Sequence, residues 1–352
     1  MKSFLKIVFS FAVTILCWGV YGPLLHVGRH KMALLPDDAS QFVGLRPFIC
    51  VGLAYFLIGV LAAGAYLYFR GEQGHWTLSG TLWSFAAGTV GALGALGVIM
   101  AFAFGGAPIF VMPLVFGGAP VVNAFLTISM TGKMKEVGSV FLAGLIIVVL
   151  GAMVVLVFRP SPSSSGVHEG VEFLDWLLSL ASVAIVVVCW GAYGPILHKG
   201  QMKMAGSRLR PLVCVGVSYC VVAVLLPGIL LGVWEEQSQF TFSGSMWSLA
   251  AGAAGAIGAL GIIMAFNFGG KPMVVMPLVF GGAPVVSTIT TMILKRNIGE
   301  VHALFYSGMI LVIAGAAIVL VFAPKGQPAA EGQPSTEDSP AEEEADTSES
   351  AP

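Results

Sequence analysis

Charged residues are scarce in this chain. Asp, Glu, Lys and Arg together make up 10% of its 352 residues, whereas soluble proteins carry about 25%. Apolar residues make up 57%. This composition excludes an ordinary soluble domain and predicts a protein that resides in the lipid bilayer. A nucleic-acid partner is not expected.

The sequence also lacks the motifs of metal, disulfide and catalytic sites. Its five cysteines lie in apolar surroundings without CxxC spacing, so we expect them to be small packing residues. An intramembrane enzyme would need an HExxH zinc site, paired aspartates or a serine with a histidine at depth. None of these motifs is present. Neither a metal, a cofactor nor an enzymatic activity is expected.

Acidic residues are missing from the depth of every apolar segment and gather instead at the C-terminus. Eight of the eighteen lie after Lys325, so the remaining body carries a formal charge of +7. A tail of this composition cannot bury enough apolar area to offset the entropy of ordering. We therefore predict a disordered acidic tail at 325–352. The lack of a buried carboxylate weakens the case for carboxylate-based proton or sodium coupling.

Long apolar runs are abundant. A bilayer core of about 30 Å needs roughly 20 apolar residues per helix. Ten such segments are predicted, near 5–26, 47–69, 80–104, 108–130, 138–158, 174–197, 211–234, 245–268, 272–294 and 301–322.

The chain is an internal duplication. MPLVFGGAPVV occurs at 112–122 and again at 276–286, CWGVYGPLLH at 17–26 returns as CWGAYGPILH at 189–198, and RPFICVG at 46–52 returns as RPLVCVG at 210–216. We predict a first five-helix repeat at 1–160, a linker at 161–173 and a second five-helix repeat at 174–324. The fold class is therefore an all-α integral membrane protein.

An odd number of helices per repeat makes the second copy enter the membrane from the opposite side, so the two repeats have inverted topology. Eleven of the seventeen Lys and Arg residues fall on the side that holds the N-terminus. The cytoplasmic side collects such an excess. Both termini, including the acidic tail, are predicted to be cytoplasmic in a plasma membrane protein (the cell inner membrane).

The fourth helix of each repeat is the most unusual segment. Glycine weakens a helix and proline removes one of its hydrogen bonds, so we predict kinked or unwound breaks at Gly117, Gly118 and Pro120, and at Gly281, Gly282 and Pro284. Paired breaks of this kind indicate a transporter's binding site, although a packing kink is the alternative. Polar side chains follow each break and are candidate substrate ligands, namely Asn123, Thr127, Ser287 and Thr291.

Aromatic residues gather near the end of the first helix of each repeat. Trp18 and Tyr21, with their counterparts Trp190 and Tyr193, are predicted to face a substrate cavity. Anchoring at the bilayer interface is the alternative for such residues. His26 and His198 close the same motif and are candidates for proton coupling because histidine titrates near neutral pH. The interfacial alternative applies to them as well.

This arrangement resembles the drug/metabolite transporter superfamily, and in particular its EamA-like ten-helix group. The resemblance covers residues 4–324. It rests on the five-plus-five arrangement, a third helix with glycine at every third residue, a short turn into a proline-bearing fourth helix, and Glu136 or Glu300 ahead of the fifth. The CWGxYGPxLHK motif at 189–199 is more weakly similar to the glucose/ribose porter and rhamnose symporter branches.

Members of this superfamily move amino acids, sugars, nucleotide sugars or drugs, so the resemblance implies a secondary transporter that works by alternating access. A small polar metabolite, such as a sugar or an amino acid, is the expected substrate, and the lipid bilayer is the expected surrounding. The resemblance also allows a homodimer. A non-transporting scaffold or partner-binding membrane protein is the alternative function.

Overall fold

The structure is a computed structural model. It describes residues 2–34, 43–130, 132, 138–158, 173–233, 236, 238–270, 272–295 and 302–322. The predicted linker, apart from Phe173, and the predicted acidic tail lie outside the described residues, as do Glu136 and Glu300.

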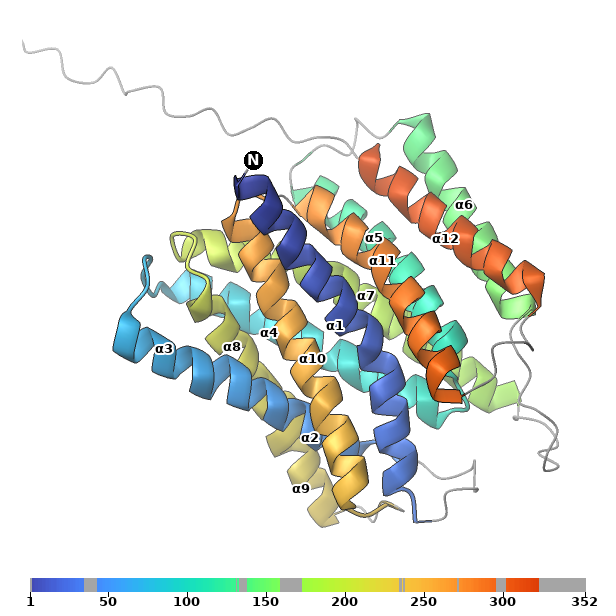
Figure 1. Ribbon diagram of the computed structural model, residues 1–352, viewed down its shortest axis with the longest axis horizontal. Coiled ribbons are helices and arrows are strands. Elements are labelled where there is room, and N and C mark those ends of the chain that lie inside the picture. The colour runs from blue at the N-terminus through green and yellow to red at the C-terminus, as the bar shows by residue number, and fades with distance from the viewer. Residues whose placement is uncertain are drawn as a thin grey trace, which may run out of the picture.

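The described chain is helical, and its helices lie side by side in one bundle (Figure 1). In chain order they are α1 (Lys2–Met32), α2 (Leu45–Tyr55), α3 (Ala63–Arg70), α4 (Leu78–Ala103), α5 (Pro108–Met130), α6 (Ser139–Val157), α7 (Phe173–Lys203), α8 (Leu209–Tyr219), α9 (Leu226–Val233), α10 (Phe242–Asn267), α11 (Pro272–Lys295) and α12 (Ala303–Val321).

Two of the predicted helices carry a π-helical section. The section Phe56–Ala62 joins α2 to α3, and Cys220–Leu225 joins α8 to α9. The described chain therefore forms ten helical rods, and their bounds follow the ten predicted segments closely. The first helix of each half is longer than predicted, because α1 continues to Met32 and α7 to Lys203.

Seven of these rods are long and apolar enough to cross a membrane, with mean hydropathies between 1.8 and 2.4. They are α1, α4, α5, α7, α10 and the two rods with π-helical sections. Shorter apolar stretches lie in α6, α11 and α12. These features are those of a multi-pass membrane protein.

The helix breaks predicted in the fourth helix of each repeat are not interruptions. Both α5 and α11 run as α-helix through their Gly-Gly-Ala-Pro segments, so the prediction of an unwound segment is wrong there. The glycines instead admit neighbouring side chains. A Cβ added at Gly117, Gly118 or Gly282 would lie closer than 3.0 Å to Val312, Val187 or Ile15, respectively. Close packing therefore explains these glycines.

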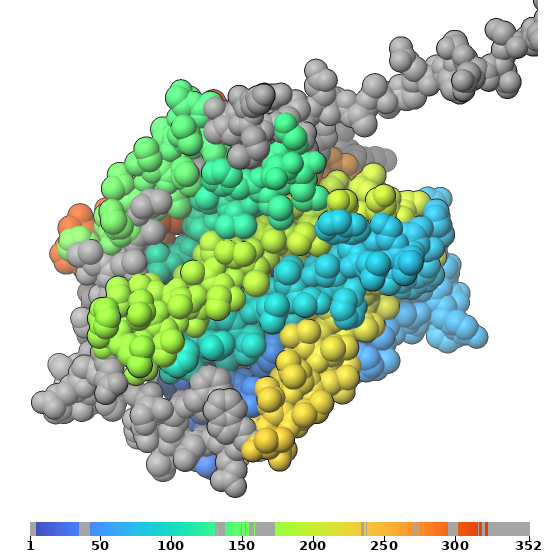
Figure 2. All heavy atoms as spheres, turned by 180° about the vertical axis from the view of Figure 1, so that it is seen from behind, coloured from blue at the N-terminus to red at the C-terminus, as the bar shows by residue number. Residues whose placement is uncertain are grey.

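The two halves of the chain interlock. Helix α1 packs along α10, and α7 packs along α4, so the first helix of each half lies against the third rod of the other half. Figure 2 shows α7 lying between α4 and α5 on one face of the molecule. The outermost pair in Figure 1, α6 with α12, also joins the last helix of each half.

Glycine rows make this close packing possible. In α4 the row faces the second half, and in α10 it faces the first half; the glycines are Gly88, Gly91, Gly94 and Gly97, and Gly252, Gly255, Gly258 and Gly261. A Cβ at any of these positions except Gly91 would lie closer than 3.0 Å to an atom of the other half. The rows therefore bring backbone and side chains of the two halves together.

Threonine caps fix the starts of the same two helices. Thr77 accepts a hydrogen bond from the backbone N of Gly80 at the start of α4, and its hydroxyl donates to the carbonyl of Lys203 at 2.8 Å. Thr241 does the same for α10, with the carbonyl of Lys31 as its acceptor at 2.8 Å. Each cap thus satisfies a helix terminus and ties one half to the other.

Candidate functional site

A small aromatic cavity lies where the two halves meet. Six aromatic side chains and two glycines line it, namely Trp18, Tyr21, Tyr55, Gly91, Trp190, Tyr193, Tyr219 and Gly255. Its volume is about 30 Å³, which is enough for about two or three water molecules by the usual criterion of about 10 to 15 Å³ each.

The cavity lining consists of matched pairs from the two halves. Tyr55 stacks on its counterpart Tyr219, with ring centroids 3.6 Å apart and planes inclined by 3°. Trp18 lies against its counterpart Trp190, with centroids 6.3 Å apart and planes inclined by 25°. The cavity therefore has nearly the same chemistry when viewed from either half.

Both tryptophans are held by the opposite glycine row. The indole Nε1 of Trp18 donates to the carbonyl of Gly255 at 3.2 Å, and that of Trp190 donates to the carbonyl of Gly91 at 3.2 Å. The rings lie directly over Gly258 and Gly94, respectively, where a Cβ would overlap them. The glycine rows thus both orient the indoles and leave room for them.

Two of the lining tyrosines carry buried hydroxyls. The Tyr21 ring contacts Trp190 edge-on with centroids 5.8 Å apart, and the Tyr193 ring contacts Trp18 in the same way at 6.0 Å. Both hydroxyls are buried and have no hydrogen-bond partner among the described residues. Each is available to donate one hydrogen bond to a solute and to accept others.

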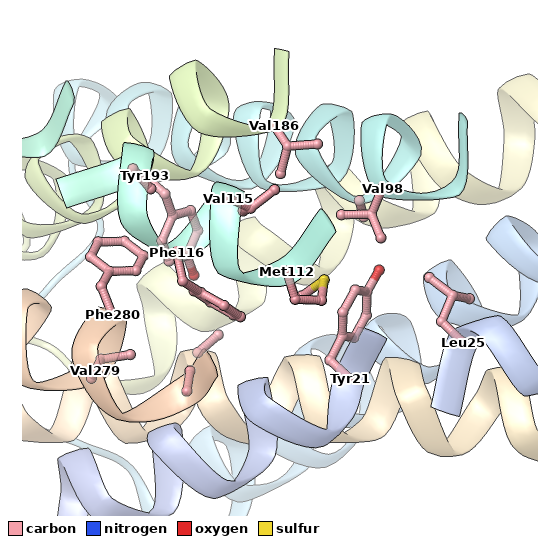
Figure 3. Close-up of a cluster of buried hydrophobic side chains, with 14 of the residues drawn as sticks. Tyr21, Leu25, Val98, Met112, Val115, Phe116, Val186, Tyr193, Val279 and Phe280 are labelled. Atoms are coloured by element: carbon pink, nitrogen blue, oxygen red, sulfur yellow. The ribbon is translucent and has the colours of Figure 1, made fainter. Parts of the chain in front are cut away.

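A phenylalanine pair backs the tryptophans. Phe116 of α5 and Phe280 of α11 are 6.2 Å apart, and each also contacts one of the two indoles. Figure 3 shows Phe116 beside Phe280 and Tyr193, and Tyr21 beside Met112. The fourth helix of each half therefore supports the cavity through its phenylalanine.

The lining sets limits on what the cavity can bind. It includes no charged side chain, so it offers no counter-ion to a strongly charged solute. Aromatic faces suit flat apolar faces such as those of sugar rings, and also attract cations. Among the described residues, no group of three or more His, Cys, Asp or Glu side chains is placed to hold a metal ion.

The structure brings the four predicted aromatic residues together but leaves the predicted polar ligands outside the cavity. Asn123, Thr127, Ser287 and Thr291 are absent from its lining. The Thr291 hydroxyl donates to the carbonyl of Ser287 at 2.8 Å within its own helix. The side-chain nitrogen of Asn123 and the hydroxyl of Ser287 are buried without a partner among the described residues.

The two candidate histidines also lie apart from the cavity. His26 is 4.4 Å from His30 and 5.3 Å from Phe102, measured between ring centroids. His198 packs against Phe266 at 5.1 Å. Each histidine lies eight residues beyond a cavity tryptophan, which is about 12 Å along an α-helix.

Tyr55 and Tyr219 are the cavity residues that sequence reasoning missed. Each directly precedes a π-helical section, and such sections are frequent at functional sites. The signal in the sequence was their matched position, three residues after the repeated CVG motif. Neither lies beside proline or in the Trp-Tyr motif, so nothing local set them apart from packing residues.

Comparisons with known proteins identify the fold only. No family model matches the chain, and no curated protein matches it. Solved structures do resemble it, and one of them is titled only "Crystal structure of protein". That structure is 16% identical over 89% of this chain and 97% of its own, with a TM-score of 0.56.

Proposed function

We propose that this chain is a secondary transporter that moves a small uncharged solute across a membrane by alternating access. The observation that carries the proposal is the aromatic cavity, which both halves line with matched residues. A site shared equally by two related halves can open toward one side and then the other when the halves rock. The cavity has a volume of only about 30 Å³, so the halves must move apart to admit a solute.

The architecture supports the same proposal. We infer that all ten rods span the membrane, that the two five-helix halves have inverted topology, and that both termini face the cytoplasm of a plasma membrane protein. The exchange of packing partners between halves is the arrangement expected around an approximate two-fold axis. These features agree with membership of the EamA-like group of the drug/metabolite transporter superfamily.

The lining favours a ring-shaped, uncharged polar solute such as a sugar or a nucleoside. Aromatic faces pack on the apolar faces of such rings, and the hydroxyls of Tyr21 and Tyr193 can bond their polar edges. A free amino acid carries two charges that this lining does not pair. Burying an unpaired charge is costly, so amino acids rank below neutral solutes.

Uptake into proteoliposomes tests the proposal. The purified protein is incubated with a mixed pool of labelled sugars, nucleosides and amino acids, and the lumenal contents are identified by mass spectrometry. We expect selective accumulation or exchange of a neutral solute. If folded, correctly inserted protein transports nothing from this pool or from a second pool of drugs and lipids, the result would favour the scaffold function instead.

The tyrosine hydroxyls provide a sharper test within the same assay. In Tyr21→Phe and Tyr193→Phe only a hydroxyl is lost, and neither hydroxyl bonds another described residue, so folding is expected to be unchanged. A neutral hydrogen bond contributes about 0.5 to 1.5 kcal/mol, so KM should rise roughly 2- to 12-fold in each variant. Tyr68→Phe is the matched control, because Tyr68 is 85% exposed. An unchanged KM in both cavity variants would show that these hydroxyls do not contact the solute.

A further inference from the structure

Two buried glutamates join the halves outside the cavity. Glu72 and Glu236 lie 164 residues apart, which is the spacing of the repeat in this region. The side chain of each is 2% exposed. Burying a carboxylate costs free energy unless it is paired and hydrogen-bonded. The partners of these two carboxylates therefore identify the segments that each glutamate connects.

Glu72 follows α3 in the first half, and its carboxylate accepts hydrogen bonds from the start of α8 in the second half. Its Oε1 accepts hydrogen bonds from the backbone N and the Nε of Arg208, at 2.9 and 2.7 Å. Its Oε2 accepts from the Ser207 hydroxyl at 2.7 Å and from the backbone N of Leu209 at 3.0 Å. Nη1 of Arg210 lies 3.8 Å away. This group is named the Glu72 clamp.

Glu236 follows α9 in the second half, and its carboxylate accepts hydrogen bonds from the start of α2 in the first half. Its Oε1 accepts from the backbone N of Gly44 and, at 2.8 Å, from that of Leu45. Its Oε2 lies 3.3 Å from Nη1 of Arg46 and accepts from the Ser238 hydroxyl at 2.8 Å. Nη1 of Arg46 also donates to that hydroxyl at 2.7 Å. This group is the Glu236 clamp.

The clamps lie at opposite ends of the same rod. The Glu236 clamp holds the start of the rod Leu45–Arg70, and Glu72 lies just beyond its end. A helix of 26 residues is about 39 Å long, which exceeds the bilayer core of about 30 Å. Tyr55 lies ten residues into this rod, so the cavity lies between the clamps. The two clamped rods cross in Figure 1.

Burial by itself would raise the pKa of the Glu72 carboxyl. Hydrogen bonds from Ser207, the backbone of Leu209 and Arg208 outweigh burial and hold this pKa below its ordinary value. The clamp's contribution to stability is therefore complete above the ordinary carboxyl pKa and is lost as the pH falls through the lowered pKa.

The difference in Tm between the natural protein and Glu72→Gln should be constant near neutral pH and shrink only in strong acid. A difference that does not change with pH would contradict this assignment.

We infer that Glu72 and Glu236 are the paired gates of the aromatic cavity, each closing the entrance at one membrane face. The inference rests on the proposed function. Each clamp joins the first half to the second, so the halves cannot separate at that face while the clamp is intact. Both clamps are formed in this structure, in which the cavity volume is only about 30 Å³. Transport then requires one clamp to open while the other holds.

The π-helical sections lie in the clamped rods and directly follow Tyr55 and Tyr219. Kinks in helices concentrate at such sections. Each section provides a point at which one end of a rod can swing while its clamped far end and the tyrosine stack stay in place. The gates and the cavity are therefore connected through single helices.

Distances between spin labels at each face test the gates. In a variant whose five cysteines are replaced by alanine, one label pair is placed at Lys203 and His75 on the Glu72 side. The matched pair is placed at Lys31 and Gln239 on the Glu236 side. All four positions are exposed, and each pair spans the two halves. Double electron–electron resonance in nanodiscs reports the distances without any substrate.

We expect Glu72→Gln to lengthen the Lys203–His75 distance by about 5 Å, one helical pitch, while the Lys31–Gln239 distance stays unchanged. Glu236→Gln should do the reverse. Glu72→Asp keeps the charge with a shorter reach and should give a smaller shift on the same side. Asp175→Asn, a carboxylate in the first turn of α7, is the control and should shift neither pair.

Uptake measured on the same variants separates the two proposals. Both glutamine variants should lose at least tenfold in uptake. Shifts confined to one side with no uptake by the natural protein would support the gates and contradict transport. Uptake by the natural protein without such one-sided shifts, or shifts of both pairs in every variant, would overturn the gates.

Discussion

Replacing Glu236 by alanine should lower the free energy of unfolding by about 3 kcal/mol, because removal of one partner of a buried ion pair typically costs 3 to 5 kcal/mol. The substitution removes the carboxylate that pairs with Arg46, whose side chain is 21% exposed, and leaves the backbone N–H groups of Gly44 and Leu45 without their acceptor. Unfolding by SDS in mixed micelles, followed by tryptophan fluorescence, measures the change. Asp175→Ala should change the value by less than about 0.5 kcal/mol.

The matching variant at the other clamp refines this prediction. Glu72→Ala should cost less than Glu236→Ala, because Arg208 is 40% exposed and water compensates its lost partner. Equal effects at the two positions would show that exposure of the arginine does not govern the clamp energy. A change below about 1 kcal/mol in both variants would show that the clamps do not contribute to the closed conformation.

The second large effect is expected at the glycines beneath the tryptophans. A methyl group in Gly94→Ala or Gly258→Ala would overlap the indole of Trp190 or Trp18. The ring must move into the cavity or away from the carbonyl that orients it. Overpacking of this kind costs about 1 to 3 kcal/mol. If this cost falls on the transport-competent conformations, uptake should drop about tenfold or more.

Gly64→Ala is the matched control, because Gly64 is also a helical glycine but has no atom within 4 Å of an added Cβ. Alanine there should leave uptake unchanged and stabilise the helix by about 0.5 to 1 kcal/mol. Uptake that stays normal in Gly94→Ala and Gly258→Ala, despite normal folding, would separate the tryptophans from transport. Initial rates in proteoliposomes with equal amounts of inserted protein provide the measurement.

Much of the helical framework could be predicted from the sequence. Runs of apolar residues predicted the positions of the helical rods, and the repeated sequence strings predicted the division of the chain into two halves. The two Trp-Tyr motifs were predicted to face a common cavity, and the structure places their side chains together. Their role in binding a substrate stays a prediction.

The rest depended on which helices meet, and local sequence patterns do not contain that information. Gly117 and Pro120 suggested an unwound helix, but neighbouring side chains fill the space that the glycines leave. Glu72 and Glu236 lie outside the longest repeated strings, so their match becomes visible only when the spacing of the whole repeat is applied. Apart from Ser238, their partners come from the other half and are more than 130 residues away in sequence.

The interlocking of α1 with α10 also constrains how the protein is made. Trp18 donates its hydrogen bond to Gly255, which is 237 residues later in the chain. At about 5 to 20 residues per second, a ribosome needs roughly 12 to 47 s to reach that partner. During this time the surface of α1 that later packs against the glycine row of α10 lacks its partner. We therefore expect this contact, and the packing of α1 on α10, to form only after the second half has been made.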